Sequence, residues 1–118
     1  MAPETLPDED PQKLVIEAFL KAYKDTGLQA KFPLNIHAGY AYDAFTLLRI
    51  ALEKAGKAEP EALRDALEKL QHVVGVSGVY SLSSQDHNGL GTDSLLMLAQ
   101  EAQPVHFTIS ASGTSATL

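Results

Sequence analysis

The sequence predicts an α+β arrangement in which three helices precede about three short strands. Apolar residues recur with helical spacing before His72, whereas β-branched residues and glycines dominate the stretch that follows it. The chain has 118 residues, of which 45% are apolar and 20% are charged, as is typical of one globular domain. We therefore expect the helices and strands to share a single core.

The first helix is predicted from Pro11 to Asp25. Asp10 is a typical N-cap residue, and a proline at the first helical position needs no backbone N–H. Gly27 follows the last residue with helical spacing and is expected to end the helix. Residues 1–9 contain prolines and carboxylates with few apolar side chains, so we expect an extended lead-in there.

The second helix is predicted from Tyr40 to Ala55, with Gly56 as the residue that ends it. This helix is apolar on nearly every side, whereas a helix that packs against one layer carries a single apolar stripe. Two other helices and a small antiparallel sheet give it little cover. We therefore expect either that the chain forms an oligomer or that it belongs to a larger protein.

The third helix is predicted from Pro60 to Leu70. Its first residue is again a proline, which suits the start of a helix. The apolar side chains form a narrow face, and the rest of the surface is charged. This pattern is typical of a helix at the surface of a domain.

Short irregular strands are predicted for "VVGVSGVYSLSS", because the stretch is rich in β-branched residues and interrupted by glycines. Asn88-Gly89 is the strongest hairpin signal in the chain. "SLLMLAQ" is expected to form a strand or, as the alternative, a short helix. "VHFTIS" alternates like a half-buried strand, and residues 111–118 are expected to form a flexible tail.

The sequence carries no signature of an enzyme, a cofactor or a metal site. A calcium loop that began at Asp86 would place Met97 where a carboxylate ligand is required. The four histidines are too far apart in sequence to form a local pair of zinc ligands, and they are His37, His72, His87 and His106. No phosphate-binding glycine loop or serine elbow is present, and the net charge of -6 disfavours nucleic acids. We expect no catalytic residues and no cofactor.

The remaining candidate site is the segment "NIHAGYAYD", which leads into the second helix. His37, Gly39 and Tyr40 would combine free backbone N–H groups, the positive end of a helix dipole and an aromatic wall. Such a combination suits a small ligand with a carboxylate. The alternative is that Gly39 only permits a tight entry into the helix, while Tyr40 and Tyr42 pack in the core.

Taken in order, four segments resemble the C-terminal part of a periplasmic solute-binding protein of the branched-chain amino acid ABC transporter family. They are "LPDEDPQKLVIEAFLKAY", "HAGYAYDAFTLL", "ALEKAG...PEALRDALEKL" and "GVSGVYSLSSQDHNGLGTDSLLML". The resemblance runs from roughly residue 6 to residue 98. Its most specific elements are "AYDA" at the entry to a long helix and "DHNGL" after a short strand.

The resemblance implies an α/β fold of two Rossmann-like lobes with a ligand cleft between them. Residues 10–36 would then form a helix of the second lobe and a crossing, and residues 37–110 would contribute helices and strands to the first lobe. In such a fold a sheet and further helices cover the second helix of this chain. The chain itself would be a C-terminal fragment. Its acidic, proline-containing first residues lack the pattern of a signal peptide.

The resemblance also implies a function without a reaction. The full-length protein would bind a branched-chain amino acid or a related small organic acid in the periplasm or elsewhere outside the cytoplasm, and would deliver it to an ABC permease. His37, Ala38, Gly39 and Tyr40 would line the cleft. The alternative is a self-associating or ligand-sensing module without a transport role.

Overall fold

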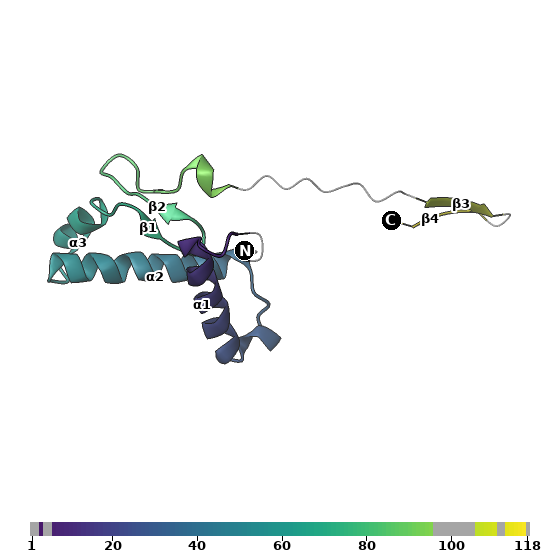
Figure 1. Ribbon diagram of the computed structural model, residues 1–118, viewed down its shortest axis with the longest axis horizontal. Helices are drawn as coiled ribbons and strands as arrows, with labels where there is room; N and C mark the ends of the chain where they lie inside the picture. Colours follow the sequence, from purple (N-terminus) through teal and green to yellow (C-terminus); the bar gives the residue numbers. More distant parts are fainter. Residues whose placement is uncertain (1–2, 4–5, 96–105, 111–112, 118) are drawn as a thin grey trace.

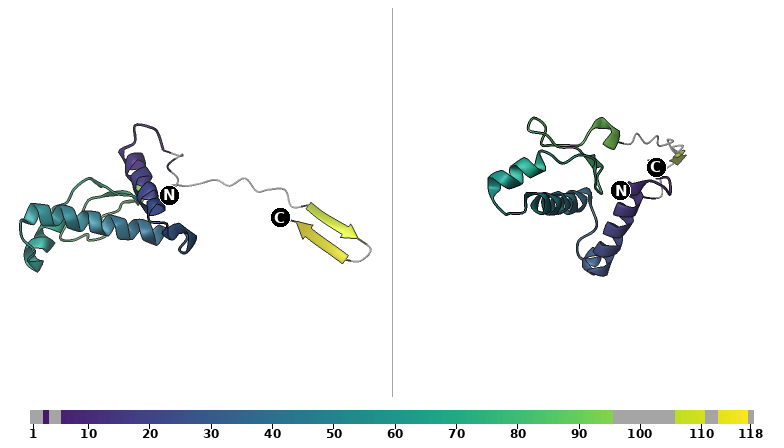
Figure 2. Two further views of the ribbon diagram at one scale, coloured as in Figure 1. Left: turned by 90° about the horizontal axis from the view of Figure 1, so that it is seen from below. Right: turned by 60° about the vertical axis from the view of Figure 1, so that its left-hand side comes forward.

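The computed structural model describes residues 3, 6–95, 106–110 and 113–117 of the chain. The helices are α1 (Pro11–Asp25), α2 (Ile36–Ala55) and α3 (Pro60–Leu67). Figure 1 shows α2 as the longest element, with α1 near its N-terminal end and α3 beside its C-terminal end. Figure 2 shows that α1 crosses α2 at a steep angle rather than running alongside it.

Helix α1 has the bounds that the sequence predicted. The Asp10 side chain accepts a hydrogen bond from the Gln12 N–H at 2.9 Å, and Pro11 occupies the first turn. The chain leaves the helix through Gly27, whose φ of 70° is readily adopted by glycine. Ile16 and Phe19 are the buried residues of α1 and form one core cluster with Val76.

Helix α2 begins at Ile36, earlier than the predicted start at Tyr40. The Asn35 side chain caps the helix by accepting hydrogen bonds from the N–H groups of His37 and Ala38, at 3.0 and 3.2 Å. Asparagine is among the most favourable N-cap residues, and this cap outweighs the cost of a glycine inside the first turns. The helix ends as predicted, at Gly56 in a left-handed conformation.

Helix α3 ends at Leu67, and the residues up to Leu70 form tight turns instead of the predicted continuation. Leu70 is completely buried. Its carbonyl oxygen accepts a hydrogen bond from the Leu82 N–H at 2.8 Å. The early end of the helix thus allows one residue to fill the core and to pair with the segment that follows the sheet.

The predicted short strands are β1 (Val73–Val74) and β2 (Val79–Tyr80), which pair antiparallel. A tight turn joins them, and the Gly75 N–H donates to the Gly78 carbonyl oxygen at 2.8 Å. The sheets among the described residues are both two-stranded and antiparallel. The described residues therefore show mixed helix and strand content without the parallel sheet of a Rossmann-like lobe.

The segment that contains Asn88-Gly89 turns the chain, but no described strands flank it, so the hairpin that this dipeptide signals does not form there. Gly89 has a φ of 70°, and its carbonyl oxygen accepts from the Ser81 N–H at 2.9 Å. A short 3₁₀ turn, η3 (Thr92–Ser94), follows it. Most of the predicted element "SLLMLAQ" lies outside the described residues.

The C-terminal strands β3 (His106–Ser110) and β4 (Gly113–Thr117) form a separate antiparallel hairpin. Strand β3 confirms that "VHFTIS" forms a strand, as its alternating pattern predicts. Strand β4 lies where the sequence predicted a flexible tail. The reason is that each of its five residues pairs with one in β3, from Gly113 opposite Ser110 to Thr117 opposite His106.

Helix α2 is only partly covered among the described residues, as its composition predicted. Its buried residues are Gly39, Asp43 and Ala51. The side chain of Phe45 is 74% exposed, although phenylalanine is normally buried. The other large apolar residues that α2 exposes are Ile36, Tyr40, Tyr42 and Leu48.

Candidate functional site

The four residues of the predicted ligand segment lie in the first turns of α2 and face two directions. His37 and Tyr40 are exposed, and their spacing of three residues places them on the same side of the helix. Ala38 packs against the core cluster of α1, and Gly39 is buried. The structure therefore presents two of the four predicted side chains to solvent.

The start of α2 differs electrostatically from the free helix end that the sequence suggested. The N–H groups of His37 and Ala38 already donate to the Asn35 side chain. An anion at this end would therefore interact with the helix dipole and with the side chains of His37 and Tyr40, not with these two amides. An imidazole and a phenol can both donate hydrogen bonds to a carboxylate.

Tyr40 also forms part of the wall of a cavity beside the start of α2. The volume of this cavity is about 540 Å³, which is in the range of small-molecule sites. Its lining has no charged side chain and consists of Tyr40, Tyr80, Asn88, Leu90, Gly91, Thr92, Ser94 and Leu95. These groups suit the apolar and neutral polar parts of a ligand.

Asp43, one turn after Tyr40, is a buried acid that is not among the predicted site residues. Its side chain is 1% exposed. One carboxylate oxygen, Oδ1, accepts from the Val76 N–H at 2.6 Å, and the other, Oδ2, accepts from the Ser77 N–H at 2.8 Å. The Tyr80 hydroxyl donates to Oδ2 at 3.0 Å. A single acid within an otherwise apolar helical segment was the available signal.

Tyr80 lies between Asp43 and the cavity. Burial raises the pKa of its hydroxyl to about 12, and the negative charge and hydrogen bond of Asp43 act in the same direction. The hydroxyl therefore remains a hydrogen-bond donor throughout the neutral range. Because the same side chain lines the cavity, the Asp43 carboxylate helps to fix the shape of the cavity wall.

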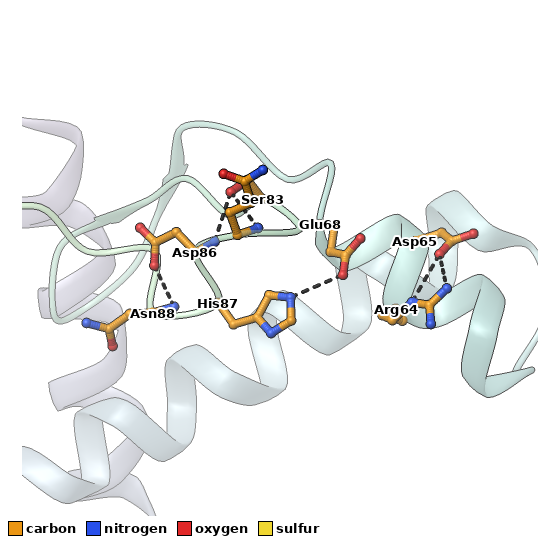
Figure 3. Close-up of polar contacts among 8 residues, drawn as sticks. Arg64, Asp65, Glu68, Ser83, Asp86, His87 and Asn88 are labelled. Atoms are coloured by element: carbon orange, nitrogen blue, oxygen red, sulfur yellow. Dashed lines mark hydrogen bonds and ion pairs between the residues drawn. The ribbon is translucent and has the colours of Figure 1, made fainter.

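A second cavity of about 640 Å³ lies between α2, α3 and the segment from Leu82 to Asn88. Its wall is mainly apolar, and Leu47, Leu63 and Leu67 are among its residues. At its edge, His87 Nε2 lies 3.1 Å from a carboxylate oxygen of Glu68, as Figure 3 shows.

Asp86, the acid at which a calcium loop would begin, has a structural role in the same segment. The Asp86 side chain accepts hydrogen bonds from the N–H groups of Asn88 and Gly89, at 2.9 and 3.2 Å. These bonds hold the turn drawn in Figure 3.

The described part of the chain has no group of three or more histidine, cysteine or acidic residues that could hold a metal ion. In the same part, no helix is long and apolar enough to cross a membrane.

The chain resembles solved structures of longer proteins. It matches an extracellular ligand-binding receptor from Rhodopseudomonas palustris with a TM-score of 0.65 and 26% sequence identity, over 100% of this chain and 32% of the receptor. A second protein from the same organism matches with a TM-score of 0.60 and 24% identity, over 98% of this chain and 31% of its own length, and shows likeness of fold alone. This chain thus spans about a third of these proteins. No protein-family model and no curated protein matches its sequence.

Proposed function

We propose that this chain is the C-terminal part of an extracytoplasmic solute-binding protein that serves an ABC transporter. The observation that carries the proposal is the likeness over the whole chain to an extracellular ligand-binding receptor, with a TM-score of 0.65. The family resemblance of the sequence motifs supports the same conclusion independently. In this proposal the solute is a branched-chain amino acid or a related small organic acid, and the partner is an ABC permease.

The proposal assigns α1, α2 and α3 to a fold of two Rossmann-like lobes, with the parallel sheets supplied by the rest of the longer protein. It accounts for the exposed apolar surface of α2, because the other part of a lobe would cover Phe45 and Leu48. It also accounts for the difference in length between this chain and the matched receptor, because the chain covers 32% of that receptor.

The ligand would bind at the first turns of α2. The positive end of the helix dipole favours a carboxylate, and the side chains of His37 and Tyr40 lie on one exposed face there. A two-lobed protein closes on its ligand, so each side supplies only part of the contacts. This chain by itself is therefore expected to bind weakly, with a dissociation constant on the order of 1 mM or weaker.

Ligand-observed NMR tests this proposal at the concentrations that weak binding requires. We expect saturation transfer from the chain to leucine, isoleucine or valine, and a loss of that transfer in the His37→Ala and Tyr40→Ala variants. Matched controls are His87→Ala and Phe45→Ala, because these remove an imidazole and an aromatic ring elsewhere on the surface. Equal loss in the control variants, or binding that none of the four substitutions changes, would contradict the assignment of the site.

The second candidate function is self-association, as in an interaction or sensor module. The exposure of Phe45, together with Leu14 at 65% on the neighbouring helix α1, favours it. Two copies could cover these side chains by packing the same surface against each other. The solution mass distinguishes the two candidates, because self-association predicts a stable dimer or larger oligomer.

A further inference from the structure

The turn between β1 and β2 binds a carboxylate in a specific geometry. The N–H groups of two successive residues, Val76 and Ser77, donate to the two different oxygens of Asp43, at 2.6 and 2.8 Å. Successive backbone N–H groups in a turn form a concave site for anions. The Tyr80 hydroxyl adds a third donor at 3.0 Å.

The surroundings of this carboxylate resemble a binding site more than an ion pair. No ion pair among the described residues includes Asp43, although its side chain is 1% exposed. The buried charge is therefore balanced by hydrogen-bond donors and backbone dipoles. All of these donors come from the hairpin, whereas the carboxylate comes from α2.

Gly75 is what allows this close approach. A Cβ atom at this position would lie 2.7 Å from Oδ1 of Asp43 and 2.8 Å from a ring carbon of Tyr80. No neighbouring atom can move away easily, because both side chains are buried. A glycine at this position thus leaves free the space that the Asp43 carboxylate and the Tyr80 ring occupy.

We propose that the Gly75–Gly78 turn is a carboxylate-binding site in its own right, and that Asp43 is the ligand which the chain supplies to it. The binding of α2 to the β1–β2 hairpin is then an intramolecular anion-recognition event. A small monocarboxylate is the class of external ligand that the site accepts when the Asp43 carboxylate is removed. This inference does not depend on the proposed transport function.

Chemical rescue tests the proposal. Asp43→Ala removes a group the size of formate and leaves the donors of the turn in place. We expect the thermal midpoint of the Asp43→Ala chain to rise with added formate and to saturate, as mass action requires for a ligand of the folded state. The wild-type chain, whose site is filled, is expected to show no saturable rise.

Three controls separate this effect from a general effect of salt. Sodium chloride at equal ionic strength and the neutral amide formamide should not replace formate. Asp65→Ala removes a carboxylate at the surface and should respond to formate like the wild type.

A double variant tests the donor that Tyr80 contributes to the site. Adding Tyr80→Phe to Asp43→Ala removes this donor and should raise the formate concentration at half saturation about tenfold.

The rescue remains informative if Asp43→Ala is unfolded in buffer. In that case formate, and neither control solute, should restore the helical circular dichroism signal. The proposal is overturned if formate changes Asp43→Ala no more than it changes the wild type, or if chloride and formamide act equally well.

Discussion

The hydroxyl of Tyr80 in β2 donates a hydrogen bond of 3.0 Å to the buried carboxylate of Asp43 in α2, across 37 positions of sequence. The same carboxylate holds the turn that precedes β2 through two backbone N–H groups. Asp43 is thus the polar link between the central helix and the small sheet. Because Tyr80 also lines a cavity beside Tyr40, this link connects the core to the candidate ligand site.

Asp43→Asn is expected to destabilise the chain although it preserves the size of the side chain. An amide nitrogen cannot accept a hydrogen bond, so the N–H of Val76 or Ser77 loses its partner in a buried position. A buried donor without a partner costs about 1–3 kcal/mol in the free energy of unfolding. Urea unfolding followed by circular dichroism measures the change.

The matched control for this substitution is Asp65→Asn, which changes an exposed carboxylate in α3. It should alter the free energy of unfolding by no more than about 0.5 kcal/mol. Equal effects of the two substitutions would show that the buried link contributes no specific stability.

Tyr80 predicts a particular loss of stability at high pH. Its pKa is about 12 in the folded chain, compared with an ordinary value of 10.0, chiefly because of burial. Above pH 10 the unfolded chain releases this proton while the folded chain retains it, so the folded state binds more protons. The free energy of unfolding should therefore fall as the pH rises from 10 to about 12, and the contribution is complete below pH 10.

Tyr80→Phe isolates this contribution, because phenylalanine keeps the ring and has no proton to lose. The difference in unfolding free energy between wild type and variant should be constant below pH 10 and should decline above it. A difference that stays constant up to pH 12 would contradict the raised pKa.

Gly75→Ala is expected to cost about 1–3 kcal/mol, because the added methyl group would overlap Asp43 and Tyr80. The cost should be smaller in the Asp43→Ala background, where one of the two overlapping side chains is absent. A double-mutant cycle by urea unfolding measures this coupling. Gly27→Ala is the control, because no atom lies within 4 Å of its added methyl group, and its cost should be the same in both backgrounds.

The exposed surface of α2 predicts a separation between stability and solubility. Phe45→Ser should change the free energy of unfolding little, since Phe45 is 74% exposed, but it should reduce association at high concentration. Light scattering after size exclusion, over a concentration series, measures the association. Leu70→Ala is the contrasting variant and should cost about 2–5 kcal/mol, because Leu70 is fully buried.

The parts of the fold that the sequence predicts well are those defined by neighbouring residues. Asp10 and Pro11 give the start of α1, and Gly56 gives the end of α2, because caps act within a few residues. The predicted start of α2 is too late, because Gly39 is typical of a loop, whereas the Asn35 side chain caps the helix before this glycine. The end of α3 depends on the burial of Leu70, which no local pattern reveals.

In the candidate site, too, the sequence predicts what depends on neighbouring residues and not what depends on tertiary contacts. The sequence pointed to His37 and Tyr40 through the resemblance and the helix entry, and the structure places both on one exposed face. The role of Asp43 could not be predicted, because its partners lie 33 to 37 positions away. The cavity beside Tyr40 also depends on residues near Leu90, which tertiary structure alone brings close.

Protein-observed NMR of the ¹⁵N-labelled chain, titrated with leucine to millimolar concentrations, tests the proposed function most directly. We expect weak, saturable shifts of the amide resonances of His37 and Tyr40, with little change at Phe45. Tight binding by this chain alone would contradict the proposal that it supplies one side of a cleft. Saturable shifts that leave His37 and Tyr40 unchanged would contradict the proposed site.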